Sequence, residues 1–213
     1  SGDWSSDVCS SDLPGTHLHG SLPCTPWTSW QRLNLKRASS AARDKIMAMR
    51  EQSLEFVRSF VKIAKEVLKN GGSVTFEWPR YCDGWRQPVV KDMIECLNLQ
   101  PIDIDGCAVG VQDLQGVPIM KPWRIMASSD AVVRSLRGHV CDRDHAHATC
   151  EGKETAKSAI HPKRLCELIH EALDEHERAR DERSVAPGVG KAHQIVEVTN
   201  TAAGEECRRR RRR

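Results

Sequence analysis

A cysteine in a tight turn is the residue of this chain best placed for chemistry. Residues 20–28 read Gly-Ser-Leu-Pro-Cys-Thr-Pro-Trp-Thr and overlap the end of a short extended candidate at residues 16–22. Ligands of open α/β sheets gather where strands end, and a thiol there can act as a nucleophile if its surroundings lower its pKa. Cys24 is therefore a candidate nucleophile. The alternative is that it fills the turn as a small apolar residue.

A carboxylate, Glu77, ends the next extended run. Residues 73–77 read Ser-Val-Thr-Phe-Glu, which is typical of a buried strand, and Trp78 and Pro79 end it. Beyond Glu77, aromatic and basic residues interleave, with Trp78 and Arg80 as the first pair. Such a set can stack unpaired bases, and the alternative is that the tryptophan fills the core.

Four segments resemble, in order, motifs of the cytosine-5 DNA methyltransferase family. Residues 20–28 are similar to its nucleophile loop, Gly-Gly-Pro-Pro-Cys-Gln-Gly-Phe-Ser, and residues 76–79 to its Glu-Asn-Val motif. Residues 116–125 resemble Gly-Val-Pro-Gln-x-Arg-x-Arg, and residues 158–162 resemble the closing Gly-Asn-Ala-Val-Pro. The departures from these motifs are Leu22, Thr25, Pro26, Trp27, Thr28, Ile119, Lys121 and the late position of Arg124.

This resemblance implies transfer of a methyl group from S-adenosylmethionine to C5 of cytosine in DNA. Cys24 would attack C6 of a cytosine held out of the stack, and Glu77 would hold the ring nitrogen and amino group. The implied substrate-binding residues are Pro23, Trp78, Arg80, Lys121 and Arg124. The family's glycine-rich cofactor turn does not precede Pro14, so we expect a truncated fragment that is inactive alone. Similar domains occur in mobile-element and viral polyproteins.

A second group of residues could bind a metal. Cys141, His145, His147 and Cys150 place four soft ligands within ten residues, although Cys-x3-His-x-His-x2-Cys is not a common zinc spacing. The alternative is a polar loop with incidental thiols. The second functional hypothesis is accordingly a non-catalytic nucleic-acid-binding domain of a mobile-element polyprotein that binds zinc. The third is a structural fragment from a chimeric assembly.

Alternating strand and helix patterns predict an α/β fold with a mainly parallel, partly Rossmann-like sheet that lacks its N-terminal cofactor-binding strands. Apolar spacing predicts helices at residues 41–69 and 88–97, and another helix starts at Pro162. Extended segments are expected near residues 102–109 and 123–127. Without a first strand, the strand at residues 16–22 would have an open apolar edge, which predicts aggregation or pairing with another chain.

The predicted organisation is one domain between two tails. Residues 1–13 contain Asp-Trp-Ser-Ser-Asp-Val-Cys-Ser-Ser-Asp-Leu, which matches a translated sequencing adapter, so we assign no function to them. Residues 14–173 form the methyltransferase-like domain, and residues 174–213 a charged helical extension with a disordered arginine-rich tail.

Composition limits the possible partners. The net charge of +3 falls to −3 without the run at residues 208–213, so the body is not a polycation that would attract DNA by overall charge. Nine cysteines without a secretory signal are expected to be reduced thiols. No apolar run reaches the roughly 18 residues of a membrane span. We therefore expect a soluble intracellular protein, with nucleus and cytoplasm both open.

Overall fold

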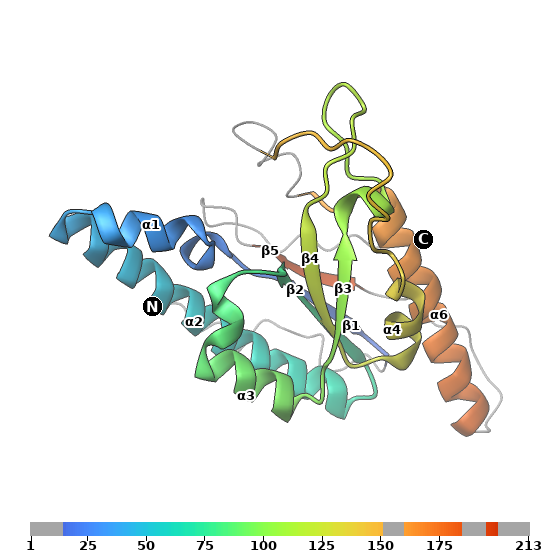
Figure 1. Ribbon diagram of the computed structural model, residues 1–213. Coiled ribbons are helices and arrows are strands. Elements are labelled where there is room, and N and C mark those ends of the chain that lie inside the picture. Colours follow the sequence, from blue (N-terminus) through green and yellow to red (C-terminus); the bar gives the residue numbers. More distant parts are fainter. Residues whose placement is uncertain (1–14, 151–159, 185–194, 200–213) are drawn as a thin grey trace. The chain divides into compact units, whose positions relative to one another are not determined.

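The computed structural model describes residues 15–150, 160–184 and 195–199, and these residues form a mixed α/β fold with an open sheet (Figure 1). They divide into two compact units. The first holds residues 15–77, 82–99 and 195–199, and the second holds residues 78–81, 100–150 and 160–184. Strand β2 (Ser73–Pro79) starts in the first unit and ends in the second.

Parallel pairing organises the sheet of the first unit. Strand β1 (His17–Ser21) pairs in parallel with β2 on one side and with β5 (Ile195–Thr199) on the other. In this register Leu18 lies opposite both Val74 and Val196. The predicted open edge on β1 is therefore wrong, because β5 supplies the hydrogen-bonding neighbour that the sequence pattern did not reveal.

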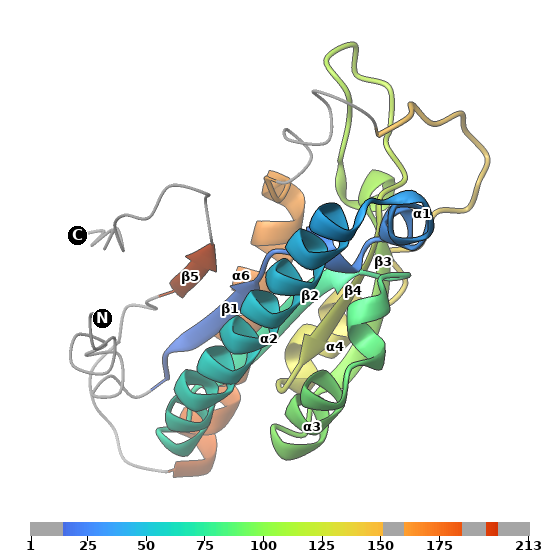
Figure 2. The ribbon, with the colours of Figure 1, turned by 90° about the vertical axis from the view of Figure 1, so that its left-hand side faces the viewer.

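Helix α2 (Ser40–Lys69) covers this sheet, and Figure 2 shows it running beside β1. Its Ser39 N-cap accepts a hydrogen bond from the Ala42 amide, which satisfies one of the free donors at the helix start. The helix side that is removed from solvent carries residues at helical spacing: Ser53, Val57, Phe60, Ala64 and Val67. The predicted helix at residues 41–69 is confirmed.

Two glycines allow the backbone to approach closely here. A Cβ on Gly20 would lie 2.5 Å from the Phe60 ring, and one on Gly72 would lie 2.1 Å from the Thr16 carbonyl oxygen. Side chains at these positions would force the helix and strand apart. The Asn-Gly-Gly stop after residue 69 therefore ends the helix and also makes room for the turn into β2.

The other helices of the first unit are shorter. The single-turn helices η2 (Thr25–Trp27) and η3 (Asp83–Arg86) follow β1 and β2 respectively. Helix α1 (Trp30–Arg37) precedes α2. Helix α3 (Pro88–Cys96) packs against α2. Proline at the start of α3 suits its first turn, because the amide it lacks would have no partner there.

An antiparallel pair forms the sheet of the second unit. Strand β3 (Gln100–Asp105) pairs with β4 (Pro122–Ala127), with Asp103 directly opposite Arg124. Between them lie a single-turn helix, η4 (Gly106–Val109), and a loop closed by a bridge between Gln112 and Pro118. The expectation of a mainly parallel, Rossmann-like sheet is therefore not confirmed. Parallel pairing joins β1 to β2 and β5, and β3 and β4 are antiparallel because no crossover helix joins them in the way that a parallel pair requires.

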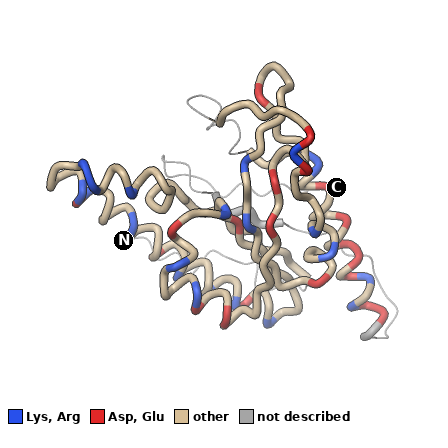
Figure 3. Tube along the Cα trace, viewed as in Figure 1, with Lys and Arg blue, Asp and Glu red and all other residues tan. Residues whose placement is uncertain are grey.

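Helix α4 (Asp130–Leu136) packs beside this strand pair, and α6 (Lys163–Ser184) packs against α4. The buried residues of α6 include Leu165, Leu168 and Ile169. Charged residues of both signs occur along the same helix (Figure 3). The predicted charged extension is the continuation of this helix. Strand β5 lies within the stretch expected to be disordered, and residues 1–13, 158, 159 and 208–213 lie outside the described residues.

Among the described helices, none combines the length and apolar character that a membrane crossing needs.

Candidate functional site

The turn that carries Cys24 follows strand β1 directly. Cys24 is the N-cap of η2, with a backbone φ of −93° and ψ of −12°, and its carbonyl oxygen accepts the Trp27 amide over 2.9 Å. Pro26 lies at the second position of this helix, where its fixed φ suits the turn. Cys24 is half-buried. The thiol is therefore held at the carboxyl end of a strand with part of its surface exposed.

Helix α2 fixes this turn through side chains. Ser53 accepts a hydrogen bond from the Trp27 indole over 2.9 Å and donates one to the Pro23 carbonyl oxygen over 3.3 Å. The Arg50 guanidinium donates to the Pro26 carbonyl oxygen over 3.1 Å and lies 5.0 Å from the centre of the Trp27 ring. Both ends of the Pro-Cys-Thr-Pro segment are thereby tied to one rigid helix.

Glu77 lies at the corresponding end of β2. Because β1 and β2 are parallel neighbours, their carboxyl ends meet at the same edge of the sheet, and Ser21 donates a hydrogen bond of 3.0 Å to Glu77 Oε2. The glutamate is 6% exposed. The structure thus gathers the two residues expected to be catalytic at one edge of the first unit.

A second cysteine, Cys82, lies beside them. Burial raises the pKa of its thiol to about 12, and the neighbouring Cys24 and Glu77 both add to that shift. Cys82 is therefore a neutral thiol near physiological pH, and the half-buried Cys24 is the more accessible of the two. The seven cysteines in the described part of the chain are all outside disulfides.

The remaining predicted substrate residues, apart from Pro23, belong to the second unit. Trp78 is 1% exposed and serves as a core residue. Arg124 makes a two-pronged contact with Asp103 over 2.7 and 2.9 Å, as their opposed positions in the β3–β4 register allow. Lys121 lies over the Trp123 ring, with its Nζ 5.1 Å from the ring centre. These contacts give each residue a structural role within its own unit.

Arg80 anchors a buried charge network in the second unit. It contacts Asp105 over 3.1 Å and Asp103 over 3.5 Å, and it donates to the Ile104 carbonyl oxygen over 2.9 Å. Asp105 is 1% exposed, so its charge depends on this partner. Its other carboxylate oxygen accepts the Cys141 amide over 3.0 Å, and this bond connects the network to the loop after α4.

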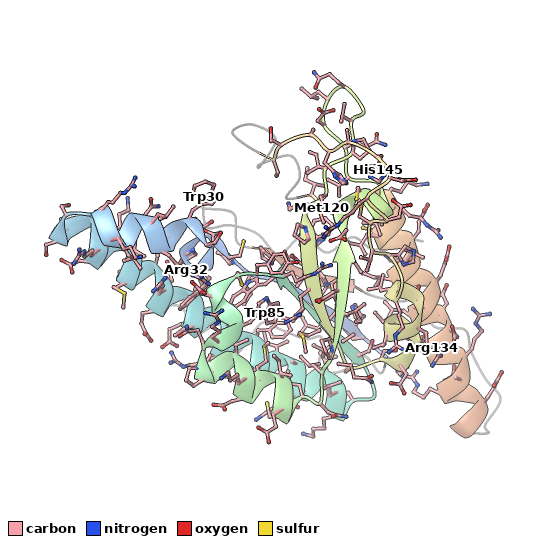
Figure 4. All side chains as sticks on the ribbon, in the orientation of Figure 1. Trp30, Arg32, Trp85, Met120, Arg134 and His145 are labelled. Carbon is pink, nitrogen blue, oxygen red and sulfur yellow. The ribbon has the colours of Figure 1, made fainter. Side chains whose placement is uncertain are left out.

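That loop and helix η4 together supply four residues that could hold a metal. The possible ligand atoms of Cys107, Cys141, His145 and His147 all lie within 4.8 Å of one another. Figure 4 shows His145 and Met120 toward the same end of the β3–β4 pair. Burial, followed by the hydrogen bond with Cys141, raises the pKa of the Cys107 thiol to about 11. Two thiols and two imidazoles form a donor set compatible with zinc.

This set differs from the one predicted from sequence. Cys141 and both histidines are present, but Cys150 is not part of the group, and Cys107 takes the fourth place. Cys107 lies in η4, 34 positions before Cys141 along the chain, so local spacing could not connect the two. Its sequence signal was its place just after Gly106 at the end of a buried strand, where loop residues commonly carry function.

Comparison with protein-family models, with curated proteins and with solved structures finds no match to this chain.

Proposed function

We propose that the first unit carries the base-binding and nucleophilic part of a cytosine-5 DNA methyltransferase-like site. The observation that carries this proposal is the meeting of Cys24 and Glu77 at the carboxyl ends of two parallel strands, with Ser21 hydrogen-bonded to the carboxylate. A thiol and a carboxylate at one sheet edge match the two functions that the motif resemblance assigns. The substrate would be a cytosine base in DNA.

The chemistry requires a nucleophile and a hydrogen-bonding group on different parts of the ring. The Cys24 sulfur would form a bond to C6 of an unstacked cytosine, which makes C5 electron-rich. Glu77 would hydrogen-bond the ring nitrogen and the exocyclic amino group, stabilising the charge that develops on the ring. Loss of the C5 proton after methylation would break the sulfur–carbon bond and release Cys24.

S-adenosylmethionine would supply the methyl group in a complete reaction of this kind. The resemblance places this cofactor on a glycine-rich turn after the family's first strand, and none of the four matched segments corresponds to that turn. Donor binding is therefore not assigned to the described residues. The proposal concerns the addition of Cys24 to the base, which requires no methyl donor.

Covalent trapping tests this step. Single-stranded DNA in which one cytosine is replaced by 5-azacytosine has a more electrophilic C6, because nitrogen replaces C5 in the ring. We expect the full chain to form a one-to-one adduct with this DNA, visible as a mass increase under denaturing conditions. Cys24→Ser should abolish the adduct, and Glu77→Gln should slow its formation by 100-fold or more, on the order of the loss of one oxyanion-stabilising donor.

Cys96→Ser is the matched control, because Cys96 is an exposed cysteine in the same unit, on α3. Its adduct yield should equal that of the unmodified chain. Adduct formation that persists in Cys24→Ser, or no adduct at all, would overturn the proposal. DNA binding without an adduct would favour the non-catalytic nucleic-acid-binding domain instead.

A further inference from the structure

We propose that Cys107, Cys141, His145 and His147 bind one zinc ion and that this ion has a structural role in the second unit. The four side chains come from two segments, the single-turn helix η4 and the loop that follows α4. With four protein ligands the coordination shell is complete, which is typical of structural zinc rather than catalytic zinc. This inference is independent of Cys24 and its chemistry.

The distances between the ligand atoms suit a tetrahedral ion. Cys141 Sγ lies 3.4 Å from His147 Nε2 and 3.8 Å from His145 Nε2. Zinc–sulfur bonds of about 2.3 Å and zinc–nitrogen bonds of about 2.1 Å at tetrahedral angles separate sulfur from nitrogen by about 3.6 Å. The two histidine rings meet edge to face, with centres 4.6 Å apart, so both Nε2 atoms can converge on one point.

Groups around the ligands also have the arrangement that a metal site needs. His145 Nδ1 lies 2.7 Å from Asp144 Oδ1, so its proton on Nδ1 leaves Nε2 as the nitrogen with a lone pair for the metal. A carboxylate in this position orients a metal-binding histidine and increases its basicity.

The sulfur of Cys141 has its own supporting contact. The Arg143 amide lies 3.2 Å from this sulfur, and Arg143 has a φ of 66°, in the left-handed region. Such a conformation is unfavourable for a residue with a long side chain and persists only where the surroundings compensate for it. Here it directs an N–H donor at the atom that would carry negative charge as a zinc-bound thiolate.

The ion would add a metal link between two parts of the unit that hydrogen bonds already join, such as the one of 2.9 Å from the Asp105 amide to the His139 carbonyl oxygen. Cys107 lies two residues after the end of β3, and the Cys141 amide donates a hydrogen bond to Asp105, the last residue of that strand. Zinc would therefore hold the loop of residues 141–147 against the buried pair of Asp105 and Arg80. A function as a metal-dependent anchor for this loop follows from that geometry.

Metal analysis of the full chain, expressed without an affinity tag, tests the proposal. We expect one zinc per chain after dialysis. Replacement by Co²⁺ should give the visible absorption of a tetrahedral ion and a near-ultraviolet sulfur-to-cobalt band. Cys107→Ala and His147→Ala should each weaken binding by more than about 100-fold, and Asp144→Asn by about 10-fold, as observed for groups that orient metal ligands.

Cys150→Ala is the matched control, because Cys150 belongs to the same loop and lies outside the four-residue group. It should retain zinc and the cobalt spectrum. Loss of zinc in Cys150→Ala together with retention in Cys107→Ala would overturn the assignment, as would an unmodified chain that takes up no tetrahedral Co²⁺. The cobalt spectrum of the unmodified chain tests the site without any substitution. The proposal therefore stays testable even if one of the variants fails to fold.

Discussion

Each unit has a cysteine in a turn or loop and a buried carboxylate near the end of a strand, but different interactions hold the cysteine in place. In the first unit Cys24 lies in a turn that Ser53 fixes by donating a hydrogen bond to the Pro23 carbonyl oxygen and accepting one from the Trp27 indole. The Arg50 guanidinium also packs over the Trp27 ring. In the second unit Cys141 is held by Asp105, a buried carboxylate that pairs with Arg80. The first arrangement leaves one thiol half-buried, whereas the second gathers four side chains that could hold a metal.

The largest expected effect comes from removing the charge that holds the second unit. Asp105→Ala would leave the Arg80 guanidinium, which is 12% exposed, without its closest carboxylate. Breaking one side of a buried ion pair costs about 3 to 5 kcal/mol, and we expect a loss in the free energy of unfolding near the lower end of that range. Urea denaturation measures it.

Asp103→Ala provides the control, because Asp103 is 37% exposed and its pairs are partly screened by water. The Asp103→Ala variant should lose no more than about 1 kcal/mol in its free energy of unfolding. Equal losses of unfolding free energy in Asp105→Ala and Asp103→Ala would show that the buried ion pair stabilises this unit no more than the exposed pair does.

A smaller loss is expected from the neutral anchor of the first unit. Ser53→Ala removes the acceptor of the buried Trp27 indole N–H, and a buried donor without a partner costs about 1 to 3 kcal/mol. Hydrogen exchange should increase in peptides covering residues 20–30 and remain unchanged in residues 139–150. Ser59→Ala, at an exposed position of the same helix, should change stability by less than about 0.5 kcal/mol.

The smallest effect concerns the pH dependence of Cys82. Its pKa is raised from 9.0 to about 12 in the folded chain, so the unfolded chain loses this proton first as the pH rises. The stabilisation is fully present below pH 9 and declines above it, by about 1 kcal/mol between pH 8 and pH 10. Comparing the urea midpoints of the unmodified chain and of Cys82→Ala across this pH range isolates the contribution of Cys82 to stability. If the two midpoints changed with pH in the same way, Cys82 would not be buried as described.

Local patterns in the sequence predicted the elements that depend on one helix or strand. Apolar spacing at Val57, Phe60, Ala64 and Val67 identified α2, since that face packs against the sheet whatever else the fold contains. The position of Glu77 at a strand end likewise needed only the boundary set by Pro79.

Features that depend on distant segments were not predictable in the same way. The direction of β4 relative to β3 is not encoded in either short apolar run, and the parallel neighbour β5 lies far along the chain from β1. The sequence pattern predicted Cys150 as the fourth member of the Cys/His group, whereas the structure has Cys107 there. The cause is the same, because residue 107 comes close to the loop only when the chain is folded.

The passage of strand β2 from one unit into the other limits how this protein can be dissected. The first unit is built from segments near both ends of the described chain, and residues 78–81, between two of its segments, belong to the second unit. No single break in the gene can therefore deliver the two units as separate, intact products. An N-terminal fragment ending at residue 99 would carry Arg80 away from Asp105, so deletion mapping would report the failure of a severed ion pair rather than the function of either unit.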